Sequence, residues 1–288
     1  MSVEYGEHGR WGGRLTRRPL PERDPAIAAL PARARRRLAE IWLYRAAMER
    51  RVADSFQVIR GALERRGASG ELLALAARAV DDEYRHTELS RVVASRFEGH
   101  ELALPERLPL ELPSHASASP ELRDTLHVVG QCVLNETTAG AYLEVCLTHA
   151  SGALARAALQ ELLSDEIDHG RIGWAHLASV DSATRAAVGP WILPMAYLNL
   201  RSWMGQTPDD PEQSDVLGAH GAPPASAIRA ALRQVIGDLV VPGLEELGMN
   251  ATPLARWLAA GAFTDRPPRE LAEQWDNRGT TRPGLPVG

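Results

Sequence analysis

The chain carries one five-residue pattern twice, Asp-Glu-x-x-His, at residues 82–86 and again at residues 165–169. Both copies lie in long segments of helical periodicity, where side chains three residues apart project from one face. Each Glu and His could therefore bind one metal ion from that face. One Glu-x-x-His would mean little, because the Glu and His content of 288 residues predicts roughly 0.7 of a match by chance. Two copies, each with a preceding Asp, indicate a metal site built between two helices.

Composition excludes several other classes of protein. A net charge of −5 gives no reason to expect a nucleic-acid or anionic-membrane partner. No apolar run reaches about 18 residues, so no membrane span is expected. The two cysteines, Cys132 and Cys146, are roughly 21 Å apart along one predicted helix and cannot pair, which suits the cytoplasm. The sequence contains no Lys, which excludes Schiff-base chemistry on a lysine.

Apolar periodicity predicts four long helices, followed by three shorter ones. The long helices are expected at about 31–66, 71–97, 120–149 and 153–180. Turns at 67–70 and 151–152 join them into two hairpins, and a Pro-rich connection at 99–120 links the hairpins. Ser119 and Pro120 form the expected start of the third helix. Two hairpins joined by a long crossover predict an all-α fold, a ferritin-like four-helix bundle.

The domain prediction divides the chain into three parts. Residues 1–30, rich in Gly and Pro, are expected to form a flexible N-terminal arm. Residues 31–180 form the predicted bundle. Residues 181–288 form a C-terminal helical extension, with helices at about 182–204, 225–247 and 252–262, and a Pro-rich tail from Asp265.

The two remaining ligands are predicted from the register of each hairpin. Folding about the turn at 67–70 places Glu49 level with Glu83, and folding about 151–152 places Glu136 level with Glu166. Both predicted acids point into apolar helix faces. Two alternatives remain open. Arg45, one turn before Glu49, could form an ion pair with that acid. Glu144 is an alternative to Glu136, although the hairpin does not place it level with Glu166.

The resulting set contains four carboxylates and two imidazoles, ligands that suit Fe and Mn. Di-iron sites in bundles use one Glu from each of two helices and a Glu-x-x-His from each of the other two. The predicted metal ligands are Glu49, Glu83, His86, Glu136, Glu166 and His169. Because a metal-bound His usually donates its other N–H to a carboxylate, Asp82 and Asp165 are predicted to support the two histidines.

On these residues, about 38–180 of the chain resemble the ferritin-like di-iron carboxylate proteins. The first motif matches the Asp-Glu-x-Arg-His signature of di-iron oxygenases and ribonucleotide-reductase small subunits, which adds Arg85 to the residues around the ligands. The second motif departs from that signature, with Asp168 where the family often has Arg. The resemblance gives no account of residues 181–288.

The resemblance implies two Fe ions, or Mn/Fe, with O2 as co-substrate. The expected activity is that of a non-haem di-iron oxygenase or oxidase that hydroxylates, N-oxygenates or desaturates a small organic substrate. An external electron donor is expected, and a homodimer is an open option. The predicted lining of the substrate pocket is Phe56, Val80, Val133, Leu159 and Leu162.

Other members of the family fit less well. An iron-storage ferritin usually has a shorter chain, and a ribonucleotide-reductase small subunit usually has a Tyr where this chain has Ser90. Arylamine N-oxygenases often carry an extra His at the position of Leu162. Two alternatives stay open beside the oxygenase: a ferroxidase or iron-handling protein, and a metal-free helical interaction protein.

Overall fold

The computed structural model describes residues 15–204 and 214–261, and every regular element in these ranges is helical. The all-α prediction is confirmed. In chain order the elements are α1 (Pro25–Ala29), α2 (Ala32–Arg65), α3 (Gly70–Glu98), α4 (Pro120–Val128), the π-helix η1 (Val129–Asn135), α5 (Glu136–His149), α6 (Ala153–Ser179), α7 (Ser182–Met204), α8 (Ser214–Gly218), α9 (Ala225–Val235), the π-helix η2 (Ile236–Val240), α10 (Val241–Glu246) and α11 (Thr252–Ala259).

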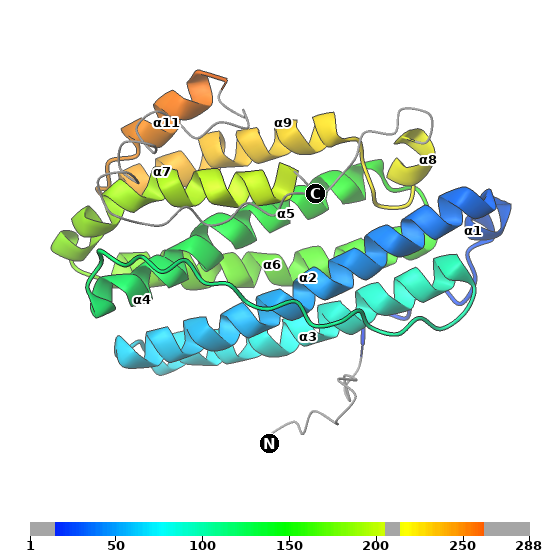
Figure 1. The fold of residues 1–288 in the computed structure, drawn as a ribbon, viewed down its shortest axis with the longest axis horizontal. Helices are drawn as coiled ribbons and strands as arrows, with labels where there is room; N and C mark the ends of the chain where they lie inside the picture. Colours follow the sequence, from blue (N-terminus) through cyan, green and yellow to red (C-terminus); the bar gives the residue numbers. More distant parts are fainter. Residues whose placement is uncertain (1–14, 205–213, 262–288) are drawn as a thin grey trace.

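Four long helical segments pack side by side around a common interior (Figure 1). Helix α2 packs along α3, α3 packs against α6, and α6 packs against η1 and α5. Helix α4 returns to α2 and closes the ring. We call these segments, with α4, η1 and α5 counted as one rod, the four-segment ring.

Local sequence signals fix both ends of α3, which carries the first motif, and the start of α4. The Ser69 side chain accepts a hydrogen bond from the backbone N–H of Leu72 and caps the N-terminus of α3. Ser119 caps α4 in the same way, with Pro120 in the first turn, as the sequence predicts. Gly99 ends α3 at a φ of 93°, a left-handed conformation that glycine adopts without strain.

The C-terminal helices lie on the ring rather than apart from it. Helices α7 and α9 lie on the far side of α5 from α2 and α3, and α11 lies beyond them (Figure 1). One buried hydrophobic cluster runs through both parts, including Leu126 and Leu134 of the ring and Val188, Leu232 and Leu244 of the later helices. Burial of this shared apolar surface holds the extension on the ring.

The structure adds elements that periodicity does not predict. The arm expected at 1–30 contains the short helix α1, capped by the Asp24 side chain through the N–H of Ala26. Helix α8 is a second unpredicted short element, and two predicted helices contain π-helical segments. Residues 1–14 of the arm and the predicted tail from Asp265 lie outside the described residues, and the three-part domain division stays a prediction.

None of the helices in the described ranges is both long enough and apolar enough to cross a membrane.

Helix α6 approaches η1 so closely at Gly173 that no side chain fits there. A Cβ at Gly173 would lie 2.7 Å from the backbone N of Val133 and 2.9 Å from the carbonyl carbon of Cys132. We expect Gly173→Ala to lower the free energy of unfolding by about 1–3 kcal/mol, because backbone atoms cannot move aside cheaply. Urea denaturation measures the change. The matched control is Gly70→Ala, where a Cβ meets nothing within 4 Å, and equal stability of both variants would contradict the prediction.

Candidate metal centre

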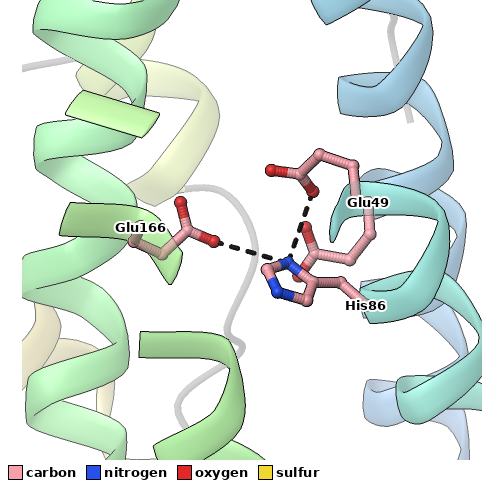
Figure 2. Close-up of side chains that lie close together, drawn as sticks. Glu49, His86 and Glu166 are labelled. Carbon is pink, nitrogen blue, oxygen red and sulfur yellow. Dashed lines mark ion pairs between the residues drawn. The ribbon is translucent and has the colours of Figure 1, made fainter. Parts of the chain in front are cut away.

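The interior of the four-segment ring holds all six predicted ligands. Glu49 comes from α2, Glu83 and His86 from α3, Glu136 from the start of α5, and Glu166 and His169 from α6. Figure 2 shows Glu49, His86 and Glu166 pointing toward one another from their three helices. Five of the six residues are buried, and only Glu49 is partly exposed.

The six side chains form two overlapping groups. In the first, ligand atoms of Glu49, Glu83, His86 and Glu166 lie within 4.8 Å of one another. In the second, Glu83, Glu136, Glu166 and His169 do the same. Glu83 and Glu166 belong to both groups. Two positions that share two carboxylates are the arrangement that lets a carboxylate bridge two cations.

The two histidines present the same ring atom to the interior. His86 Nδ1 lies 3.6 Å from Glu83 Oε2 and 3.7 Å from Glu166 Oε1. His169 Nδ1 lies 2.9 Å from Glu83 Oε1, 3.4 Å from Glu166 Oε2 and 4.0 Å from Glu136 Oε2. Nδ1 is therefore the candidate ligand atom of both histidines.

The opposite ring nitrogen of each histidine faces an aspartate of the other motif. His86 Nε2 lies 3.1 Å from Asp165 Oδ2, and His169 Nε2 lies 3.7 Å from Asp82 Oδ2. Each Asp thus faces the histidine on the neighbouring helix, and Asp165 is within hydrogen-bond distance of its histidine. When the ring is neutral, the hydrogen bond at His86 favours the tautomer with the proton on Nε2, which would leave the Nδ1 lone pair for a metal ion.

Arginine side chains connect the two aspartates on the outer side of the centre. Arg85 pairs with Asp165 and lies 3.4 Å from Asp82, so one guanidinium spans both motifs. Arg17, from the segment before α1, also pairs with Asp165. Two arginines, one from the first motif and one from the N-terminal segment, thus pair with the same aspartate. Asp168 points outward, 2.9 Å from Arg78.

The π-helix η1 determines how Glu136 is held. A π-helix brings residues five apart into line, and the Gln131 side chain donates a hydrogen bond to Glu136 Oε1. Asn135 Nδ2 lies 3.2 Å from the same oxygen. Two amide donors therefore occupy Oε1, and Oε2 is left facing His169.

The interior acids and imidazoles shift each other's proton affinity. Burial, followed by the charges of neighbouring glutamates, raises the pKa of Glu49 and Glu136 well above the usual range. Burial opposes ionisation of Glu83, yet contacts with His169 and His86 outweigh it and lower its pKa to about 2. Burial also opposes a charge on His86, but Asp165 and Glu83 raise its pKa to about 10. Without metal, protons supply the compensating positive charge.

Several buried polar atoms at the centre have no hydrogen-bond partner. They include both carboxylate oxygens of Glu83, Oε2 of Glu166, and Nδ1 of both histidines. Unpaired buried polar groups are rare, because each one costs free energy on desolvation. All of these atoms face the shared interior, and their N and O chemistry fits iron or manganese. The residues present therefore fit a pair of such ions.

The sequence left two alternatives open: an ion pair between Arg45 and Glu49, and Glu144 as a ligand in place of Glu136. The structure supports neither. Arg45 directs Nη2 to the Tyr142 hydroxyl at 3.1 Å and to the Gly221 carbonyl, not to Glu49. Glu144 is exposed and belongs to neither ligand group.

Gln131, Asn135, Arg17 and Glu161 were not predicted from sequence. Glu161 accepts hydrogen bonds from the backbone N–H of Arg17 and Arg18 and thereby holds the N-terminal segment beside the centre. The π-helix and these long-range contacts have no periodic signal in the chain.

Comparison with protein-family models, curated proteins and solved structures found no match for this chain.

The histidine shifts predict how metal-free protein responds to pH. Because the folded-state pKa of His86 is about 10 and its ordinary value is 6.5, its stabilising contribution is complete below about pH 6.5. That contribution is lost as pH rises toward 10. We expect the free energy of unfolding, measured by urea denaturation in chelator, to fall across this window. His86→Gln should flatten the slope, and an unchanged slope in that variant would refute the assignment.

The aspartate and arginine contacts predict graded effects on metal affinity. Asp165→Asn removes the carboxylate that orients His86, so we expect metal to bind about 10- to 100-fold more weakly. Arg17→Ala should have a smaller effect in the same direction, because its guanidinium is largely exposed. Competitive chelator titration measures both. Arg78→Ala, which alters only the outward pair with Asp168, is the control and should bind metal as the unaltered chain does.

Proposed function

We propose that this protein is a non-haem di-iron oxygenase or oxidase of the ferritin-like class, acting on a small organic molecule with O2 as co-substrate. In this proposal the four-segment ring is a ferritin-like four-helix bundle, and the six interior side chains are the ligands of two Fe ions, or of an Mn/Fe pair. An external electron donor would supply reducing equivalents.

One observation carries the proposal: two ligand groups overlap in Glu83 and Glu166 and present unpartnered atoms to one interior. Four carboxylates offset the charge of two divalent cations, which a single-metal site would not require. A metal-free interaction protein would have no reason to bury four acids and two histidines together, because apolar residues of similar size would be as stable or more so.

The chain's own residues hold and shield the centre. Asp165 and Asp82 orient the two imidazoles, and the amides of Gln131 and Asn135 fix one oxygen of Glu136. The Phe56 ring packs 5.1 Å from that of His169. The five predicted pocket residues, Phe56, Val80, Val133, Leu159 and Leu162, are all buried. In the proposal, these apolar side chains would surround the centre and limit the access of water to it.

The bound metal pair would supply the one-electron and O2 chemistry that amino-acid side chains lack. The protein's contribution would be to hold the metal pair with the six candidate side chains.

The test is metal stoichiometry after anaerobic Fe(II) loading and desalting, followed by O2 consumption of the loaded protein. We expect about two Fe per chain, as the two ligand groups require. Glu83→Ala and His169→Ala should lose metal and O2 consumption while keeping helical circular dichroism. Glu144→Ala, an exposed acid on α5, is the matched control and should retain both.

Three results would redirect the assignment. Unchanged metal content in both ligand variants would remove the metal centre. No retained Fe or Mn in the unaltered chain would favour the metal-free interaction protein. Oxidation and accumulation of many Fe per chain would favour the ferroxidase alternative over the oxygenase.

A further inference from the structure

Arg45 is a buried cation close to the metal centre, and its contacts are all with neutral groups. The residue is only 6% exposed. Its Nη2 lies 3.1 Å from the Tyr142 hydroxyl, 3.3 Å from the Gly221 carbonyl and 3.8 Å from the Cys146 sulfur. The guanidinium carbon lies 4.1 Å from the centroid of the Trp42 ring. Burial raises the pKa of both Tyr142 and Cys146, so neither supplies a negative charge.

Among the described residues, the hydrogen bonds of this guanidinium go to no carboxylate, and Glu49, one turn along α2, acts on it only through longer-range charge attraction. Its Nη1 has no hydrogen-bond partner at all. Arginine is almost never fully buried without a paired anion, and an unmet buried charge is among the most expensive features of a fold. A bound anion that reaches Nη1 would accept a charge-assisted hydrogen bond from this nitrogen and would also offset the buried positive charge.

The position of Arg45 relates this anion site to the metal centre. Arg45 precedes Glu49 by one turn of α2, about 6 Å along the helix axis. Contacts of Arg45 with Tyr142 and of Ser55 with Gln131 show that α2 runs antiparallel to the rod of α4, η1 and α5. Glu49 is therefore level with the stretch of α5 between Glu136 and Tyr142. A small molecule anchored at Arg45 would extend along α2 toward the ligands.

The facing helix carries a partly exposed glycine near this level. Gly140 lies one turn after Glu136, and a Cβ placed there would meet no neighbouring atom within 4 Å. Glu49, on the opposite helix, is the one ligand residue with some exposure. Gly140 and Glu49 are both partly exposed, so solvent reaches the two facing helices close to the level of the ligands.

We infer that Arg45 binds the carboxylate of a small organic acid, and that this acid is the substrate class of the centre. The inference rests on the proposed function and specifies its substrate. One unpartnered nitrogen suits a singly charged carboxylate. A phosphate, with more charge and three acceptor oxygens, would need further donors.

The experiment measures binding of benzoate and of its uncharged isostere benzamide by isothermal titration calorimetry, on metal-free and on Mn(II)-loaded protein. We expect benzoate to bind both forms and benzamide to bind about 10- to 100-fold more weakly, the range of a charged hydrogen bond. Arg45→Gln should lose the same factor for benzoate and keep its metal. Arg60→Gln, on the exposed face of the same helix, should bind benzoate normally. Mn(II) should broaden the benzoate proton resonances in the unaltered chain and not in Arg45→Gln.

Equal binding of benzoate and benzamide would overturn the inference, and this comparison needs no variant to fold. So would undiminished benzoate binding to a folded Arg45→Gln, or binding that requires metal and ignores residue 45, because the carboxylate would then be a direct metal ligand. Arg45-dependent binding to a chain that retains no metal would keep the anion site while refuting the oxygenase proposal, so the two failures are distinguishable.

Discussion

The structure depends on placing four carboxylates and two imidazoles together in an apolar interior. Unpaired, such groups would lose their hydration without compensation, and the carboxylates would repel one another. The raised pKa values of Glu49 and Glu136 and the raised pKa of His86 are three responses to that constraint. Protons partly neutralise the metal-free interior, and a metal ion that binds there would have to displace them. Metal affinity is therefore coupled to pH as directly as it is coupled to ligand geometry.

The supporting contacts cross between helices. Asp82 of α3 faces His169 of α6, Asp165 of α6 faces His86 of α3, and Arg85 lies between the two aspartates. A displacement of α3 relative to α6 would therefore disturb both histidines at once. This cross-pairing makes the two helices one unit around the centre and ties that unit to the N-terminal segment through Arg17.

The C-terminal helices contribute to the centre indirectly. Asn135, which holds Glu136, is itself held by Asn199 at 3.0 Å and by the indole N–H of Trp203 at 3.1 Å, both on α7. The loop after α8 accepts hydrogen bonds at His220 and Gly221 from Trp42 and Arg45 of α2. The extension thus supports one ligand and encloses the buried cation, which gives residues beyond 181 a structural role that their sequence does not indicate.

The sequence by itself determined the helices and the six candidate ligands. Apolar periodicity, the turn at 67–70, the Ser119–Pro120 start, and the three-residue spacing of Glu and His are local properties that a helix converts directly into geometry. Counting residues back from each hairpin turn also identified Glu49 and Glu136, because the rise per residue is the same in both helices of a hairpin. Only the tertiary structure decided that each Asp serves the opposite histidine, that Gln131 reaches Glu136 through a π-helix, and that Arg45 is left without an anion. Those features depend on which helices become neighbours and on how deeply each side chain is buried between them. Contacts between residues far apart in the sequence leave no periodic pattern in the chain.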